Sequence, residues 1–195
     1  MNWTPRLLQA FEKEIEELFA AGKIKAPVHL AGGNERELIE IFKDIKSHDW
    51  VLCSWRSHYH CLLRGVPAEK LKEAIVAGHS IALCFPDYRI LSSAIVGGIC
   101  PIAVGLACAI KARKGPERVH CFIGDMTSMS GIFHECWRYC RGHDLPVHWI
   151  VEDNGLSVVT DTREVWGEQE KAPKIEVYSY KMSRPHVGIG KFVVF

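Results

Sequence analysis

The sequence has almost no net charge. Its 24 lysine and arginine residues are balanced by 23 aspartate and glutamate residues, which leaves a formal net charge of +1. Binding to nucleic acid or to an anionic membrane depends on basic side chains gathered in a patch or stripe. We therefore expect neither nucleic acid nor membrane among the partners of this protein.

Internal repeats, low-complexity stretches and linkers are also absent from the sequence. The 195 residues are 48% hydrophobic and 24% charged, which is the composition of an ordinary globular domain that can bury a sizeable core. We expect a single domain over residues 1–195.

One uncharged run, residues 90–110, has the length of a membrane-spanning helix. Serines, glycines and a proline interrupt it, so a buried loop followed by a helix explains the run better. The start of the chain is amphipathic and acidic, unlike a secretory or transit leader. These features favour a cytoplasmic location.

The eight cysteines lie mostly inside apolar runs, which indicates buried, reduced thiols. Cys136, Cys140 and His143 share the spacing of one helix face. A structural zinc site needs four ligands in a closed tetrahedron, and no second cysteine pair is evident. Core thiols are therefore the preferred interpretation.

Helical and extended patterns alternate along the chain. Helices are expected over 7–19, after a cap at Asn34, and over 67–78, 101–113 and 130–140. Strands are expected over 50–53, 118–123, 146–152 and 175–180. This alternation predicts an α/β fold with a doubly wound, mostly parallel sheet flanked by helices.

Two polar residues follow neighbouring strands of this predicted sheet. Asp125 comes after the strand at 118–123, and Asn154 comes after the strand at 146–152. Since parallel strands end at the same edge, both side chains would face one crevice. A carboxylate and an amide oxygen suit Mg²⁺, although both residues could instead stabilise turns.

The stretch from Gly124 to Asn154 resembles the thiamine-diphosphate motif, a Gly-Asp-Gly followed by Asn-Asn. Gly131 and Glu135 stand where that motif has glycine and glutamate. Three earlier segments, GKIKAPVHLAGGNERE, DWVLCSWRSHYHCLLRGVPAEKL and AIVGGICPIAVGLACAIK, resemble the alpha subunit of 2-oxoacid and acetoin dehydrogenases in the same order. The resemblance covers roughly residues 5–162. It implies the thiamine-diphosphate-binding fold, with this chain as the pyrophosphate-binding domain.

The resemblance also implies roles for individual residues. Mg²⁺ would be bound by the side chains of Asp125 and Asn154 and by the backbone carbonyl of Leu156. The cofactor, thiamine diphosphate, would contact Arg56, Ala94, Val96, Gly124, Asp125, Met126, Thr127 and Asn154. His58 would lie near the reacting centre, and His186 is the candidate substitute for a later catalytic histidine loop.

The segment around His58 also has a simpler interpretation. Arg56, His58 and His60 alternate with Ser57 and Tyr59, so they could line one face of a strand or loop as solvated residues. Period two would place His60 on the same side as His58.

The resemblance implies an enzyme that works with a second chain. A beta-type subunit would supply the pyrimidine-binding domain and an activating glutamate, in a heterotetramer. The reaction would cleave or form a C–C bond next to a carbonyl, and decarboxylation of a 2-oxo acid in a dehydrogenase reaction is the preferred assignment. A lipoyl acyltransferase is a further candidate partner.

Two alternatives remain open. GIFHE and EDNGLS are similar to transketolase, so a split transketolase subunit that transfers a two-carbon unit from a ketose is one of them. The other is a non-catalytic scaffold subunit, suggested by the short carboxyl end, by Met126 in place of the motif's glycine and by Ala82 in place of a histidine.

Overall fold

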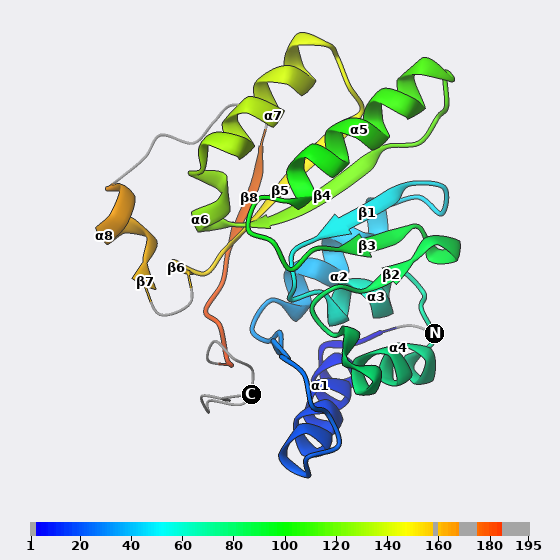
Figure 1. Ribbon diagram of the computed structural model, residues 1–195, viewed down its shortest axis with the longest axis vertical. Coiled ribbons are helices and arrows are strands. Elements are labelled where there is room, and N and C mark those ends of the chain that lie inside the picture. The colour runs from blue at the N-terminus through cyan, green and yellow to red at the C-terminus, as the bar shows by residue number, and fades with distance from the viewer. Residues whose placement is uncertain (1–2, 158–159, 168–174, 185–195) are drawn as a thin grey trace.

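A computed structural model describes residues 3–157, 160–167 and 175–184 of the protein. Its centre is a six-stranded sheet with the strand order β2-β3-β1-β4-β5-β8 (Figure 1). The strands of this sheet are β1 (Trp50–Cys53), β2 (Cys84–Phe85), β3 (Ile90–Ser92), β4 (Val119–Gly124), β5 (Val147–Asp153) and β8 (Glu176–Ser179).

The sheet is mostly parallel. β3, β1, β4, β5 and β8 pair in parallel, and only the two-residue β2 runs antiparallel, along β3. The chain passes from β1 to β3 on one side and then crosses to β4 on the other side of β1. These pairings confirm the predicted doubly wound, mostly parallel sheet.

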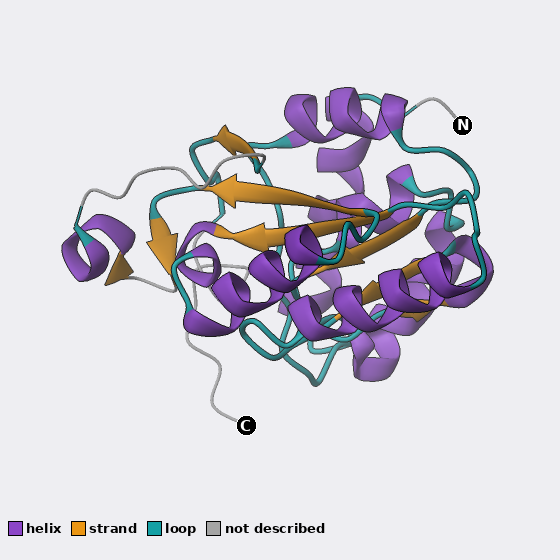
Figure 2. Ribbon diagram, turned by 90° about the horizontal axis from the view of Figure 1, so that it is seen from above, coloured by secondary structure: helices purple, strands orange, loops and turns teal. Residues whose placement is uncertain are grey.

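Helices cover both faces of the sheet (Figure 2). The long helices are α1 (Pro5–Ala20), α2 (Glu35–Asp44), α5 (Ile99–Ala112) and α7 (Gly131–Gly142). The shorter helical elements are α3 (His58–Leu63), α4 (Ala68–Ala74), η1 (Ile75–His79), η2 (Pro86–Tyr88), α6 (Asp125–Ser128) and α8 (Thr162–Trp166). A small hairpin of β6 (Leu156–Ser157) and β7 (Thr160–Asp161) precedes α8.

Two hydrophobic cores lie on opposite faces of the sheet because successive strand residues point to opposite sides. Phe122 and Ile150 pack into a core with residues of α1–α4. Cys121 and Trp149, each one residue earlier, pack into a second core with residues of α5 and α7. Burial on both faces explains why most residues of these strands are apolar instead of alternating with polar ones.

Residues 90–110 form β3, a loop and α5, and no helix in the described part of the chain is long and apolar enough to span a membrane. The predicted helix within this run is confirmed as α5. The loop is not buried as predicted, because residues 94–96 are exposed, and the sequence did not predict β3. The cysteines are free thiols, and Cys84 on β2 is exposed.

The interpretation of residues 56–60 as a strand or solvated loop is wrong. α3 begins at His58, and both His58 and His60 are fully buried. Helical geometry sends the two imidazoles to different places, because residues two apart lie on different sides of a helix. His58 contacts Glu12 and Ser80, whereas His60 packs against Phe122.

The predicted cap at Asn34 is correct in position only. Asn34 directly precedes α2, but its side chain makes no hydrogen bond to the helix backbone. Its amide nitrogen donates instead to Glu152 Oε1 and to the Tyr178 hydroxyl, each at 3.2 Å. The side chain is thereby used to join α2 to the ends of β5 and β8.

Candidate functional site

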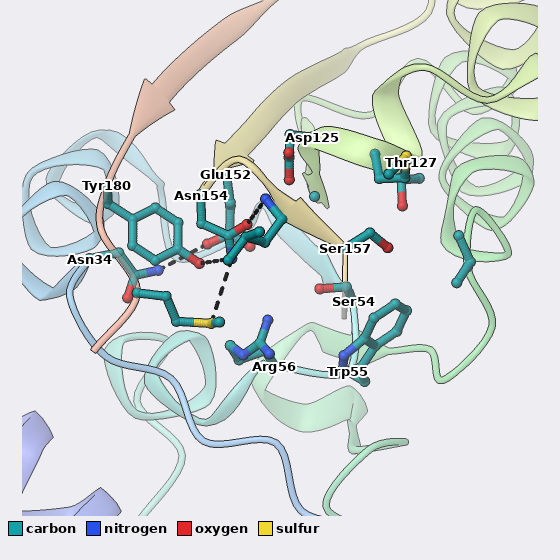
Figure 3. Close-up of a pocket in the computed structure, with 15 residues that line it drawn as sticks. Asn34, Ser54, Trp55, Arg56, Asp125, Thr127, Glu152, Asn154, Ser157 and Tyr180 are labelled. Atoms are coloured by element: carbon teal, nitrogen blue, oxygen red, sulfur yellow. Dashed lines mark hydrogen bonds between the residues drawn. The ribbon is translucent and has the colours of Figure 1, made fainter. Parts of the chain in front are cut away.

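A polar pocket opens at the carboxyl ends of the central strands (Figure 3). Ser54, Trp55 and Arg56 come from the segment after β1, and residues 124–127 come from the last residue of β4 and from α6. The other lining residues are Asn34, Val96, Glu152, Asn154, Leu156, Ser157, Tyr180 and Met182. Since the chain reverses its winding direction at β1, the pocket lies at the topological switch point, where ligands bind in such sheets.

Asp125 lies at the start of α6, on the floor of this pocket. Asp125 is 6% exposed, and its Oδ2 accepts a 2.5 Å hydrogen bond from the Thr162 hydroxyl. Burial raises the pKa of Asp125, although the Thr162 hydrogen bond acts in the opposite direction. A buried carboxylate in this state gains from a cation placed beside it.

The side-chain amide of Asn154 has a defined orientation. Its Oδ1 accepts the Leu156 backbone N–H at 2.9 Å, and its Nδ2 points at the Tyr180 hydroxyl at 3.4 Å and at Met182 Sδ at 3.6 Å. An amide oxygen has two lone pairs, so one remains for another ligand. The Asn154 side-chain oxygen can therefore bind a cation while it keeps the hydrogen bond from the Leu156 N–H.

The same pocket is also lined by two side chains that carry hydrogen-bond donors, Trp55 and Arg56. Arg56 donates its Nε–H to the Leu30 carbonyl at 3.0 Å, which fixes the start of the guanidinium. Beside it, the buried indole Nε1 of Trp55 has no hydrogen-bond partner among the residues that the structure describes. A buried N–H without an acceptor is costly, and an anionic ligand would satisfy it.

The structure brings together most of the residues that the sequence predicted for the site. The pocket is lined by Arg56, Val96, Gly124, Asp125, Met126, Thr127, Asn154 and Leu156. Ala94 is exposed and is not among the lining residues. His58 does not line the pocket either, because both of its ring nitrogens are hydrogen-bonded in the core, and His186 lies outside the described residues.

Sequence reasoning missed Glu152 and its partners. The buried Glu152 Oε1 accepts a 2.5 Å hydrogen bond from the Tyr178 hydroxyl and lies 3.4 Å from His60 Nε2. Burial alone would raise the pKa of Glu152, but His60 and the Tyr178 hydrogen bond hold that pKa below its usual value. The site therefore has a second buried carboxylate, whose charge is stabilised from behind the pocket.

Side chains at the end of β8 align with those at the end of β5. Tyr178 donates to Glu152, and Ser179 donates to Asp153 at 3.2 Å, each to its register partner. Tyr180 then meets Asn154. The sequence shows these residues as Tyr-Ser-Tyr at positions 178–180. Their contacts with β5 follow only from the pairing of β8 with β5.

No cluster of three or more His, Cys, Asp or Glu side chains suited to a metal occurs in the described ranges. Cys136 and Cys140 are buried free thiols that pack in the second core. The pocket does bring a carboxylate and an amide oxygen together, from Asp125 and Asn154, and both are ligand types that suit a hard cation such as Mg²⁺.

The family model described as dehydrogenase E1 component matches residues 4–177. The alpha subunit of acetoin:2,6-dichlorophenolindophenol oxidoreductase from Bacillus subtilis is 28% identical, over 78% of this chain and 49% of that protein. Pyruvate dehydrogenase E1 alpha subunits are also similar. One from Rickettsia typhi is 31% identical over 79% of this chain and 50% of its own length, and one from Arabidopsis thaliana is 27% identical over 81% and 42%. The chain thus spans about half the length of the curated relatives it matches.

Proposed function

Because the chain belongs to the dehydrogenase E1 component family, we propose that it is an alpha-type subunit that binds thiamine diphosphate with Mg²⁺. The reaction is C–C bond cleavage next to the carbonyl of a 2-oxo acid, carried out with a second chain. One observation carries the proposal: Asp125, Asn154 and Leu156 line the same pocket as Arg56 and Trp55. Oxygen atoms that suit a cation and N–H groups that suit an anion therefore lie in one pocket, at the topological switch point of the sheet.

The oxygen side of the pocket fits a magnesium ion. The Asp125 carboxylate, the Asn154 amide oxygen and the Leu156 carbonyl would be its protein ligands. Mg²⁺ commonly takes few ligands from protein and completes its shell with phosphate oxygens and water. Burial of Asp125 supports this assignment, because a cation stabilises the ionised carboxylate that burial disfavours.

The donor side of the pocket fits a diphosphate. The unpaired Nε1–H of Trp55 and the guanidinium of Arg56 would each donate to phosphate oxygens. Met126 and Thr127 would add backbone N–H groups. Met126 replaces the glycine of the motif, and its sulfur accepts a 2.9 Å hydrogen bond from the Trp166 indole. The larger side chain is thus used to hold α8 beside the pocket.

When bound, thiamine diphosphate supplies a thiazolium carbon that attacks a carbonyl and stores the electrons released by bond cleavage. The residues of this chain anchor and orient the diphosphate end. Glu152, hydrogen-bonded by Tyr178 and Asn34, places a fixed negative charge close enough to Arg56 for the two charges to attract each other. Ala94 remains a proposed backbone contact.

A beta-type subunit would complete the site and supply the activating glutamate, and a lipoyl acyltransferase would accept the acyl product. Exposed apolar side chains near the pocket support a protein partner there. Val96 and Leu156 line the pocket and are 56% and 39% exposed, and Ile95 is 72% exposed. Clustered exposed apolar side chains are typical of surfaces that another protein covers.

Calorimetric titration of thiamine diphosphate into the chain, with and without Mg²⁺, tests the proposal. We expect binding that requires Mg²⁺ and that weakens by about 100-fold in Asp125→Asn, since second-shell changes alone cost 10–100-fold. Asp87→Asn, an exposed carboxylate in η2, is the matched control and should bind like wild type. A co-expressed beta-type chain should strengthen binding. No Mg²⁺-dependent binding in either arm would favour the scaffold alternative.

A further inference from the structure

Thr162 and Asp125 form a hydrogen bond that neither the strand pattern nor the motif predicts. Thr162 Oγ1 donates to Asp125 Oδ2 at 2.5 Å, across 37 residues of chain. Both side chains are buried, with exposures of 7% and 6%. A short hydrogen bond from a hydroxyl to an ionised carboxylate, shielded from water, belongs to the strong class.

The local backbone holds Thr162 in this place. Its N–H donates to the Gly155 carbonyl at 3.0 Å, which closes the turn after β5 back onto itself. Thr162 is the first residue of α8, and the N–H groups of the next two residues donate to the Asp161 carboxylate at 2.7 and 3.1 Å. The position of the Thr162 hydroxyl is therefore constrained by these backbone hydrogen bonds.

A carboxylate has two oxygens and a broad range of terminal torsion angles, so its orientation depends on what its oxygens contact. The Thr162 hydroxyl occupies Oδ2. Oδ1 is left as the oxygen for a cation in the pocket that Asp125 lines. Partners that orient metal-ligating carboxylates in this way are part of a metal site, and their loss commonly weakens metal binding by about 10–100-fold.

We propose that Thr162 is a positioning residue: its hydroxyl holds Oδ2 of Asp125 so that Oδ1 faces the divalent cation. The assignment rests on the proposed function, because the cation is the one that would bridge the diphosphate. It extends the site to α8, which neither the motif nor the pocket lining includes. Thr162 itself does not touch the cofactor or the cation.

A second contact of α8 provides the matched control. The Trp166 indole N–H donates to Met126 Sδ at 2.9 Å, so α8 is joined to α6 both through Asp125 and through the next residue. Loss of the indole donor in Trp166→Phe would loosen α8 without freeing the carboxylate. General docking of α8 and orientation of Asp125 can thus be separated.

The experiment measures the Mg²⁺ affinity of the 195-residue chain by calorimetry at saturating thiamine diphosphate, and the melting temperature of each variant without Mg²⁺. Thr162→Val keeps the shape but lacks the hydroxyl, and we expect Mg²⁺ binding about 10–100-fold weaker. Thr162→Ser keeps the hydroxyl and should stay within about threefold of wild type, since its donor remains. Trp166→Phe should also stay within about threefold, even where its melting temperature falls.

Equal weakening by Thr162→Val and Thr162→Ser, or by Thr162→Val and Trp166→Phe, would overturn the proposal, because either result would indicate general loosening. Unchanged affinity in Thr162→Val would also overturn it, while leaving the proposed function in place. Wild-type protein that shows no Mg²⁺-dependent binding would overturn both. If Thr162→Val does not fold, Thr162→Ala against Thr162→Ser gives the same comparison.

Discussion

His120 and His148 face each other across β4 and β5, with their Nδ1 atoms 3.1 Å apart. Outside this pair, His120 Nε2 lies 3.3 Å from Asp49 Oδ2, and His148 Nε2 lies 2.9 Å from Glu176 Oε2. These four residues make a polar row near the amino ends of the strands, at the edge opposite the pocket. The row runs across four neighbouring strands: Asp49 directly precedes β1, and the other three residues lie in β4, β5 and β8.

Stability should fall with acid because of His120. Burial lowers the pKa of His120 to about 4, with the neighbouring His148 adding to the effect and Asp49 opposing it. A folded-state pKa below the ordinary value of about 6.5 means that the unfolded chain binds the proton better. This contribution to stability is therefore complete above about pH 6.5 and is lost as the pH falls towards 4.

Urea denaturation at pH 7.5 and pH 5 checks this expectation. We expect the His120 contribution to lower the unfolding free energy by about 2 kcal/mol at pH 5, at roughly 1.4 kcal/mol per pKa unit. His120→Gln should show a correspondingly smaller difference between the two pH values. The same pH difference in both proteins would mean that other groups cause the acid sensitivity.

The buried pair of Glu12 and His58 should stabilise the fold. Glu12 Oε1 lies 2.9 Å from His58 Nδ1, and His58 Nε2 lies 2.9 Å from Ser80 Oγ. Removing the Glu12 carboxylate leaves the buried His58 Nδ1 without its hydrogen-bond partner, so Glu12→Ala should cost about 1–3 kcal/mol in denaturant unfolding. Glu17→Ala, on the exposed side of the same helix, should cost less than about 1 kcal/mol. Similar losses in the two variants would contradict this.

Two glycines near and within α5 should respond to alanine with opposite signs. Gly97 has a φ of +73°, and an added Cβ would lie 2.6 Å from Ile132 Cγ2, so Gly97→Ala should destabilise by about 1–3 kcal/mol. Gly105 lies inside α5, where an added Cβ meets nothing within 4 Å. Gly105→Ala should stabilise by about 0.5–1 kcal/mol. Thermal melts of both variants would show whether the signs differ.

The Tyr178 hydroxyl should contribute to stability because it donates a hydrogen bond to the buried carboxylate of Glu152. Tyr178→Phe leaves that carboxylate with one donor fewer, and we expect a loss of about 1–3 kcal/mol. Tyr139→Phe is the control, since Tyr139 is half exposed on α7. If the two variants unfold at the same denaturant concentration, the Glu152 contact contributes little.

Much of the sheet could be predicted from the sequence because β1, β4 and β5 are largely buried on both faces and are mostly apolar. Their parallel order placed Asp125 and Asn154 at one edge before any contact was known. The short β2 and β3 were not predicted. Strands of two and three residues carry too little pattern, and their pairing depends on β1.

The segment after β1 shows where local pattern fails. The alternation of Arg56, His58 and His60 with two other residues is compatible with a strand, yet residues 58–63 are helical. What stabilises the helix is distant in sequence: Glu12 and Ser80 bond His58, and Phe122 packs on His60. The partners of Glu152 were hidden for the same reason, since Asn34 is 118 residues away.

The indole of Trp55 gives the pocket an optical signal of its own. Trp55 is one of six tryptophans, and its ring nitrogen is buried in the pocket wall without an acceptor in the described chain. A bound phosphate oxygen would change both the hydrogen bonding and the electric field at that ring. Replacing the other tryptophans by phenylalanine would leave a single emitter, so that loading of the site could be followed by fluorescence in unlabelled protein.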